Sequence, residues 1–263
     1  MDSRPVGLFD SGVGGLSVLR QIQRLLPAED LLYVADNHHL PYGDKSPDFI
    51  RERALRISQF LIDQGAKALV VACNTATAAA VAQLRERFPL PIVGMEPGVK
   101  PAIEQSRGGR VAILATRGTL GSGRFRDLLQ RHAAGAKVIV RPCPGWVELV
   151  EQPGTGPTEL AQAVERHVAP LLRDGVDTLV LGCTHYPFLK PTIAELAGER
   201  VHIIDTGEAV ARQLQRVLTE SRLLNGRTGP GRIEFWSSAP NPATRFLFTH
   251  LWDGPCRLEP LPV

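Results

Sequence analysis

The sequence lacks a long apolar run and any run of like charges. No stretch approaches the ~18 apolar residues of a membrane span, and the opening residues lack the apolar segment of a secretory signal. The formal net charge is only +3, which does not indicate nucleic-acid binding, although the pI near 8.8 leaves a weak basic patch open. We therefore expect a cytoplasmic protein without membrane or nucleic-acid partners.

Cysteine is also scarce, with four residues in a chain of 263, and no two of them form a C-x-x-C pair. So sparse a set is not a disulfide framework, and in a reducing compartment such thiols are free, metal-bound or catalytic. The G-x-G-x-x-G fingerprint and the Gly-Lys-Ser/Thr of a phosphate-binding loop are absent as well. The remaining composition, 43% hydrophobic and 22% charged, is that of an ordinary globular protein with one large or two small domains.

A segment that occurs twice organises the chain. Residues 65–75 read GAKALVVACNT and residues 175–185 read GVDTLVLGCTH, so that glycine, Leu-Val core and cysteine recur 110 positions apart. Each copy is typical of a strand that is buried on both faces and ends in polar residues. Ligands of open α/β sheets bind at the carboxyl ends of the strands. The repeat therefore predicts two equivalent thiols, Cys73 and Cys183, that face each other across a cleft.

Strand-like and helix-like segments alternate along the chain, beginning with an apolar run at 6–9 that ends at Asp10. The glycine-rich turn at 12–15 follows, where backbone N–H groups could approach a ligand anion or simply close a tight turn. The alternation predicts an α/β fold with two similar, doubly wound parallel-sheet domains related by pseudo-two-fold symmetry. We expect the first domain in residues 1–97 plus 207–263 and the second in 98–206, with the active site in the cleft between them.

Local signals also predict smaller features of the second half and its exit. Residues 146–151 are expected to form a turn. Asp205 is expected to cap a helix, with Glu208 three residues later as in a capping box, and Gly226 is expected to end that helix.

The paired thiols indicate a particular kind of chemistry. A thiol where a strand gives way to a helix N-terminus meets the positive end of the helix dipole, which favours thiolate. A reaction that inverts a carbon centre removes a proton from one face and returns one to the other, which is a task for two opposed acid/base groups. Cys73 and Cys183 are the candidate bases, and Asp10 and His185 are the neighbours that can tune or relay their protons. Neutral donors for a substrate's carboxylates and amino group are Ser11, Tyr42, Asn74, Thr75 and Thr184.

Other interpretations of the cysteines stay open on these residues alone. Buried cysteine often serves packing only, which is the interpretation we give to Cys143 and Cys256. Zinc would accept Cys73, Cys183 and His185 as ligands, but it normally shows a closer pair such as C-x₂₋₄-C. A redox dithiol would require the two Cα atoms to lie within about 7 Å of each other.

Four motifs resemble the aspartate/glutamate racemase family, in its glutamate branch, and the resemblance covers nearly the whole chain. They are FDSGVGG at 9–15, PYG at 41–43, ACNTA at 72–76 and GCTHYP at 182–187. The resemblance implies an enzyme that interconverts L- and D-glutamate without pyridoxal phosphate, metal or other cofactor. It also implies that the product D-glutamate supplies bacterial peptidoglycan synthesis.

The same resemblance assigns roles residue by residue. Cys73 is similar to the base that acts on D-glutamate, with Asp10 as its partner, and Cys183 to the base that acts on L-glutamate, with His185 as its partner. Positions similar to the family's substrate-binding residues are Asp10, Ser11, Tyr42, Gly43, Asn74, Thr75, Thr184 and His185, with Thr116 and Thr119 beside them. An acidic position near the family's active site is similar to Glu151, although Glu148 lies in the same run.

The substrate itself is not encoded by any single motif. Homologues that racemise aspartate share the two-cysteine chemistry, and a two-lobed protein that only binds an acidic amino acid would need no paired bases. Both stay open as alternatives to glutamate racemisation. Dimerisation is common in the family, so a homodimer is among the expected assemblies.

Overall fold

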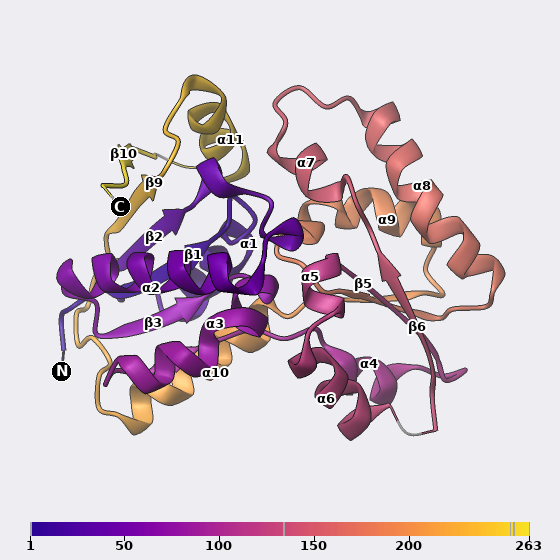
Figure 1. Cartoon of the computed structure of the whole chain (residues 1–263), viewed down its shortest axis with the longest axis horizontal. Coiled ribbons are helices and arrows are strands. Elements are labelled where there is room, and N and C mark those ends of the chain that lie inside the picture. The colour runs from indigo at the N-terminus through magenta and orange to yellow at the C-terminus, as the bar shows by residue number, and fades with distance from the viewer. Residues whose placement is uncertain (1, 134, 253, 255, 263) are drawn as a thin grey trace.

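Two parallel β-sheets form the framework of the molecule (Figure 1). The computed structural model describes residues 2–133, 135–252, 254 and 256–262. The strand pairs recorded for these residues all run parallel. The predicted α/β class with two parallel-sheet halves is therefore confirmed.

The larger sheet has the strand order β10-β9-β2-β1-β3-β4 and the smaller one the order β6-β5-β7-β8. The strands of the larger sheet are β1 (Val6–Asp10), β2 (Leu31–Ala35), β3 (Ala68–Val71), β4 (Ile92–Val93), β9 (Ile233–Ser237) and β10 (Leu258–Pro260). Those of the smaller sheet are β5 (Arg110–Ala115), β6 (Lys137–Pro142), β7 (Thr178–Leu181) and β8 (His202–Ile204). The pairing of β9 with β2 confirms that the C-terminal segment returns to the first half.

The internal repeat corresponds to equivalent places in the two sheets. The run β2-β1-β3-β4 in one sheet matches β6-β5-β7-β8 in the other, so that the repeat strands β3 and β7 both follow the central strand. The glycine that begins each copy turns the chain out of the preceding helix, with φ of +87° at Gly65 and +75° at Gly175. Both glycines close a helix, as the repeat predicts.

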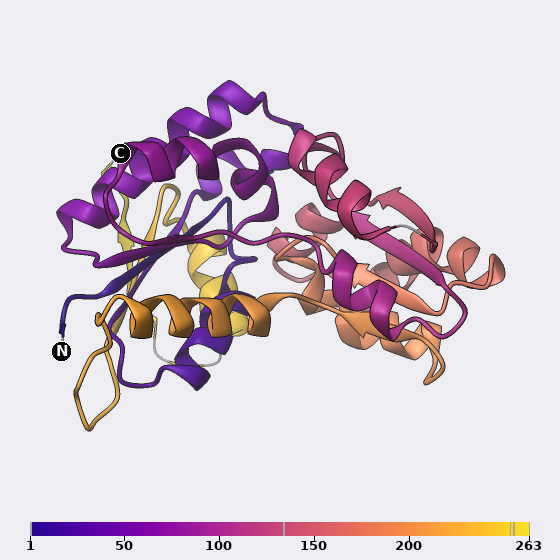
Figure 2. The same ribbon diagram turned by 90° about the horizontal axis from the view of Figure 1, so that it is seen from below.

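Helices cover both faces of the larger sheet, as Figure 2 shows. One face packs against α2 (Pro47–Asp63) and α3 (Asn74–Arg87), and the other against α1 (Leu16–Leu25), α10 (Gly207–Glu220) and α11 (Pro242–Trp252). Successive side chains of a strand point to opposite faces, so Leu8 joins the cluster under α1 while Phe9 joins the one under α2. Burial on both faces explains why these strands read as continuous apolar runs.

The smaller sheet is built in the same way. Val111 and Ile113 of β5 pack under α4 (Val99–Gln105) and α6 (Gly123–His132). Ala112 and Leu114, which point the other way, pack under the remaining helices. These are α7 (Trp146–Glu151), α8 (Pro157–Arg173) and α9 (Lys190–Ala197). Shorter elements of both halves are α5 (Arg117–Leu120) and the 3₁₀ helices η1 (Asn37–His39), η2 (Tyr42–Asp44) and η3 (Tyr186–Leu189).

Three local predictions are wrong. Residues 146–151 form the helix α7 rather than a turn, because the left-handed Gly145 redirects the chain and the buried Trp146 anchors the first turn. Thr206 rather than Asp205 is the N-cap residue of α10, although Asp205 Oδ1 accepts a hydrogen bond from Gly207 N–H at 3.4 Å. The same helix ends at Glu220, well before Gly226.

The predicted domain boundaries stay a prediction. The strands of residues 1–97 and 207–263 all belong to the larger sheet, and those of 98–206 all belong to the smaller one. This division of the strands supports the proposed boundaries.

The left-handed backbone at Gly65 predicts a measurable cost of adding a side chain. A Cβ there would meet no atom within 4 Å, so the cost of Gly65→Ala comes from φ alone. We expect a loss of about 1 kcal/mol in the free energy of unfolding, seen as a fall of about 2–4 °C in Tm. Gly229→Ala is the matched control, because that glycine also has open space but no left-handed φ. Equal Tm changes in both variants would contradict the argument.

Candidate active site

The carboxyl ends of β1, β3 and β7 bring the predicted residues together. Asp10 ends β1, Cys73 lies two residues beyond β3, and Cys183 lies two residues beyond β7. Thr184 Oγ1 donates a hydrogen bond to Asp10 Oδ2 at 3.1 Å, which joins the two halves directly. The two thiols are 4% and 7% exposed, so the site is closed to bulk water.

Cys73 lies at a helix N-terminus, as its sequence context predicts. It is the N-cap of α3, and its Sγ accepts a hydrogen bond from Ala76 N–H at 3.5 Å. The Sγ also lies 3.9 Å from Ser11 Oγ. Burial, reinforced by the Asp10 carboxylate, raises the pKa of the Cys73 thiol well above its ordinary value. The helix N-terminus thus does not by itself make Cys73 a thiolate, contrary to the expectation from the helix dipole.

Cys183 has a different environment. The chain after it continues into η3 and reaches α9 only at Lys190, so no α-helix begins at this thiol. The predicted helix N-terminus is therefore wrong for Cys183. Its partner is His185, whose Nδ1 lies 3.8 Å from the Cys183 Sγ.

Asp10 is fully buried and held by the first half's own backbone. Its Oδ1 accepts from Ser11 N–H at 2.7 Å, and its Oδ2 accepts from Gly15 N–H at 2.7 Å. Burial raises the pKa of Asp10, and the charge of His185 and the hydrogen bond of Cys73 only partly offset this effect. The carboxyl is thus poised to take or give a proton beside Cys73.

The glycine-rich turn binds a carboxylate of the protein itself. Val13 N–H donates to Glu151 Oε1 at 2.6 Å, across the interface between the halves. A Cβ at Gly12 would overlap the Glu151 carboxylate, and a Cβ at Gly14 would overlap the His185 ring. The glycines therefore make room for a carboxylate and an imidazole from the other half. The sequence had left open whether this turn binds the anion of a ligand.

Glu151, and not Glu148, contacts His185. Its Oε1 lies 2.7 Å from His185 Nε2, and its Oε2 accepts from Asn37 Nδ2 at 3.0 Å. Burial lowers the pKa of His185, but its contacts with Cys183 and Glu151 outweigh that effect and raise the pKa well above the ordinary value. The imidazole thus lies between a carboxylate and a sulfur, and these two contacts favour its protonated form.

Polar side chains without partners mark where a ligand can bind. The buried side-chain amide of Asn74 has no hydrogen-bond partner at either its Nδ2 or its Oδ1. Beside it, Thr75 Oγ1 lies 2.8 Å from Thr116 Oγ1 and 3.1 Å from Thr119 Oγ1, which gathers hydroxyls from both halves. A buried amide left unpaired is costly, so its arrangement favours a polar ligand here.

The Tyr42 hydroxyl binds to the protein itself. It was expected to offer its hydroxyl to a substrate, but that hydroxyl donates to Asp36 Oδ2 at 2.6 Å. The neighbouring Gly43 lies against Thr116, since a Cβ at Gly43 would be 2.9 Å from Thr116 Cβ. At Tyr42 and Gly43, the main chain is therefore the part left to contact a ligand.

Sequence reasoning missed two residues near the site, Asp36 and Arg53. Asp36 follows β2 as Asp10 ends β1, and an acid at a strand's carboxyl end was the available signal. Arg53 interrupts the buried apolar positions of α2 that include Ile50 and Ile57. A cation at a core-facing position predicts a buried anionic partner.

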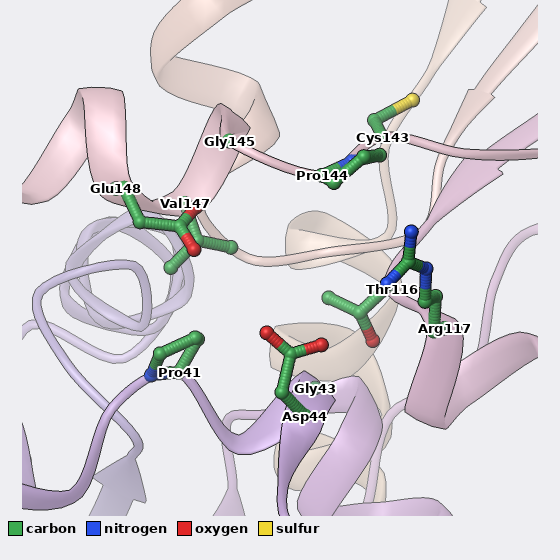
Figure 3. A pocket seen from close by; sticks show the side chains of 10 residues that line it. All are labelled: Pro41, Gly43, Asp44, Thr116, Arg117, Cys143, Pro144, Gly145, Val147 and Glu148. Carbon is green, nitrogen blue, oxygen red and sulfur yellow. The ribbon is translucent and has the colours of Figure 1, made fainter.

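A narrow cavity leads to the site between the halves (Figure 3). Its volume is about 30 Å³, room for about two water molecules, which is too little for an amino acid. The carboxylates of Asp44 and Glu148 point into it, while the Cys143 sulfur points away. The cavity is lined by Pro41, Gly43, Asp44, Thr116, Arg117, Cys143, Pro144, Gly145, Val147 and Glu148.

Two features are absent from the described part of the chain. None of its helices is long and apolar enough to cross a membrane. Within the same residues, no three His, Cys, Asp or Glu side chains are grouped so that they could hold a metal ion.

Known proteins resemble this chain over nearly its full length. The profile of the Asp/Glu/Hydantoin racemase family matches residues 6–214. A glutamate racemase of Methylococcus capsulatus is 53% identical over 261 residues, which cover 99% of this chain and 96% of that protein. The crystal structure of a glutamate racemase isoform from Bacillus anthracis matches with a TM-score of 0.91 at 32% identity, over 100% of this chain and 99% of that one. Escherichia coli glutamate racemase, in complex with L-glutamate and the activator UDP-MurNAc-ala, matches with a TM-score of 0.85 at 34% identity over 98% of each chain.

Two related parallel-sheet halves with a buried thiol from each, together with these matches, define the class of the protein as a racemase, which is an isomerase. The chain belongs to the Asp/Glu/hydantoin racemase family. The resemblance inferred from the four sequence motifs is thus confirmed.

The close contact between Gly14 and the His185 ring predicts that Gly14→Ala disables the enzyme. The added Cβ would push the His185 ring away from Cys183, because the two would otherwise overlap. We expect racemase activity to fall about 10²-fold, with the far-UV circular dichroism of the folded protein retained. Gly123→Ala is the control, since a Cβ there would lie 3.8 Å from its nearest neighbour. Full activity in folded Gly14→Ala would show that the space at Gly14 is not needed to position His185.

Proposed function

We propose that the protein interconverts L- and D-glutamate by two-base proton transfer at the α-carbon, with Cys73 and Cys183 as the bases. The single observation that carries this proposal is the pair of buried thiols, one from each half. The two halves are joined beside them by the hydrogen bond from Thr184 to Asp10. The D-glutamate would supply peptidoglycan synthesis in the cytoplasm. No cofactor is required, because the two thiols suffice for the proton transfers.

The chemistry follows from the opposed thiols. One thiolate takes the α-proton of glutamate, and the electron pair of the broken C–H bond moves into the adjacent carboxylate. The thiol on the other face then donates its proton to the α-carbon and is left as thiolate. The reverse reaction exchanges the two roles, so either enantiomer can start it.

The neighbours of each thiol have distinct tasks in this proposal. Cys73 acts on D-glutamate, Asp10 takes its proton, and the N–H of Ala76 stabilises the charge on sulfur. Cys183 acts on L-glutamate, and the protonated His185, held by Glu151, stabilises its thiolate. These assignments combine the geometry with the family resemblance.

The substrate would lie between the thiols in the cleft. The unpaired amide of Asn74 and the hydroxyls of Thr75, Ser11 and Thr184 offer its polar groups neutral hydrogen bonds. The main chain at Tyr42 and Gly43 completes the set, and Asp10 and His185 touch the same ligand. A homodimer is retained as a prediction of the resemblance.

We propose glutamate rather than aspartate as the substrate because the relative that is 53% identical is named a glutamate racemase. The Escherichia coli structure, which holds L-glutamate, supports the same choice at 34% identity. Aspartate racemisation and simple binding of an acidic amino acid are the alternatives that the following experiment separates.

The proposal is tested by NMR of the chelator-treated protein with L-glutamate in D₂O. We expect deuterium at Cα together with D-glutamate, because the proton returned by the second thiol comes from solvent. The same run with L-aspartate is the specificity control. Folded protein with reduced thiols that exchanges neither glutamate enantiomer would defeat the glutamate assignment, and exchange with aspartate alone would establish the alternative.

Each cysteine is expected to be indispensable in both directions. Cys73→Ala and Cys183→Ala should each lower racemisation of L- and of D-glutamate by at least about 10³-fold, because either direction needs an acid and a base on opposite faces. Cys143→Ala serves as the matched control, since that buried thiol points away from the cavity and should be dispensable. Retained racemisation in either folded single variant would exclude the two-base mechanism.

A further inference from the structure

A buried ion pair lies beside the site and takes no part in the proton transfers. Arg53 of α2 donates to Asp36 through two parallel hydrogen bonds, Nε to Oδ2 and a terminal nitrogen to Oδ1, each 2.9 Å long. The Arg53 side chain is 7% exposed and that of Asp36 is 0% exposed. Such a two-pronged contact fixes the orientation of the carboxylate as well as its position.

The same carboxylate holds the segment between β2 and α2. Asp36 Oδ2 also accepts the Tyr42 hydroxyl at 2.6 Å, and Oδ1 lies 3.0 Å from His39 Nδ1. His39 and Tyr42, in the segment of residues 36–44, thus both contact the carboxylate of Asp36, the first residue of that segment. Because Tyr42 is 1% exposed, its ring and hydroxyl are fixed inside the first half.

The physical role of this pair is geometric. Removing two charges from water costs about as much as their attraction returns, so a buried ion pair adds little net stability compared with apolar residues of the same size. What the Arg53–Asp36 pair provides is a defined direction for the hydrogen bond that Tyr42 makes. That direction sets the position of the main chain at Gly43.

The segment held in this way reaches the other half at two places. Gly43 lies against Gly118 as well as Thr116, since a Cβ at Gly118 would be 3.0 Å from the Gly43 carbonyl oxygen. Nearer its start, Asn37 bonds to Glu151. Asn37 is also held by the Ser237 hydroxyl at 2.9 Å, so a small shift of the Asp36 carboxylate would move the Gly43 contact.

We infer that Arg53 and Asp36 are positioning residues that hold the main chain of Tyr42 and Gly43 where it binds a carboxylate of glutamate. This inference rests on the proposed function. The pair acts on substrate affinity through Tyr42, whereas the thiols and their partners lie on other elements and keep their geometry.

The test is a comparison of KM and kcat for glutamate in both directions. Arg53→Lys keeps the charge and loses the two-pronged contact, and Tyr42→Phe removes one oxygen atom and leaves the ion pair. We expect each to raise KM about five- to tenfold while kcat stays within about twofold. The primary isotope effect of α-deuterated glutamate on kcat should be unchanged, because the proton transfer itself is not altered.

Arg56→Met is the matched control, since Arg56 lies on the same helix in an exposed pair with Glu52. Its KM should equal that of the wild type. If Arg53→Lys does not fold, Tyr42→Phe decides alone. Unchanged KM in the folded variants of an active wild type would overturn this inference only, as would a loss of kcat and Tm at constant KM. A wild type that does not racemise glutamate would overturn the proposed function and the inference together.

Discussion

The site depends on the carboxylate of Glu151, which belongs to the second half and accepts a hydrogen bond from the first. Glu151 accepts the Val13 N–H of the glycine-rich turn and contacts His185 through the same oxygen. Buried charges need such compensation, because a carboxylate without partners would cost several kcal/mol. Only glycine at positions 12 and 14 leaves room for the arrangement. The turn, the imidazole and the fit between the halves therefore form a single interdependent unit.

The two thiols are equivalent in topology but not in electrostatics. Cys73 caps a helix and lies beside a carboxyl, whereas Cys183 precedes a 3₁₀ turn and lies beside the His185 imidazole. Burial and the Asp10 carboxylate raise the pKa of the Cys73 thiol, whereas the neighbour of Cys183 is an imidazole that can carry a positive charge. An approximately symmetric fold thus places chemically different partners, a carboxyl and an imidazole, beside its two candidate bases.

The closed cavity and the anchored segment 36–44 are connected. Space for about two waters excludes an amino acid from this cavity, so a substrate that used this path would need the halves to move apart. The segment is fastened to the first half by Asp36 and touches the second half at Gly43 and Asn37. Separation would break these contacts across the cleft and leave the anchor in the first half intact. The binding surface for a carboxylate would then keep its shape while the site opens.

The sequence by itself determined the α/β class, the two related halves, the helix-closing Gly65 and Gly175 of the repeat and the two thiols, because strand burial, glycine conformation and the repeat are local signals. Only the tertiary structure decided between Glu151 and Glu148, turned the Tyr42 hydroxyl toward Asp36, and placed Arg53 in the core. Those outcomes depend on which distant side chains meet and in which rotamer. The pattern of a single segment specifies the face on which a side chain lies but does not specify its partner across an interface.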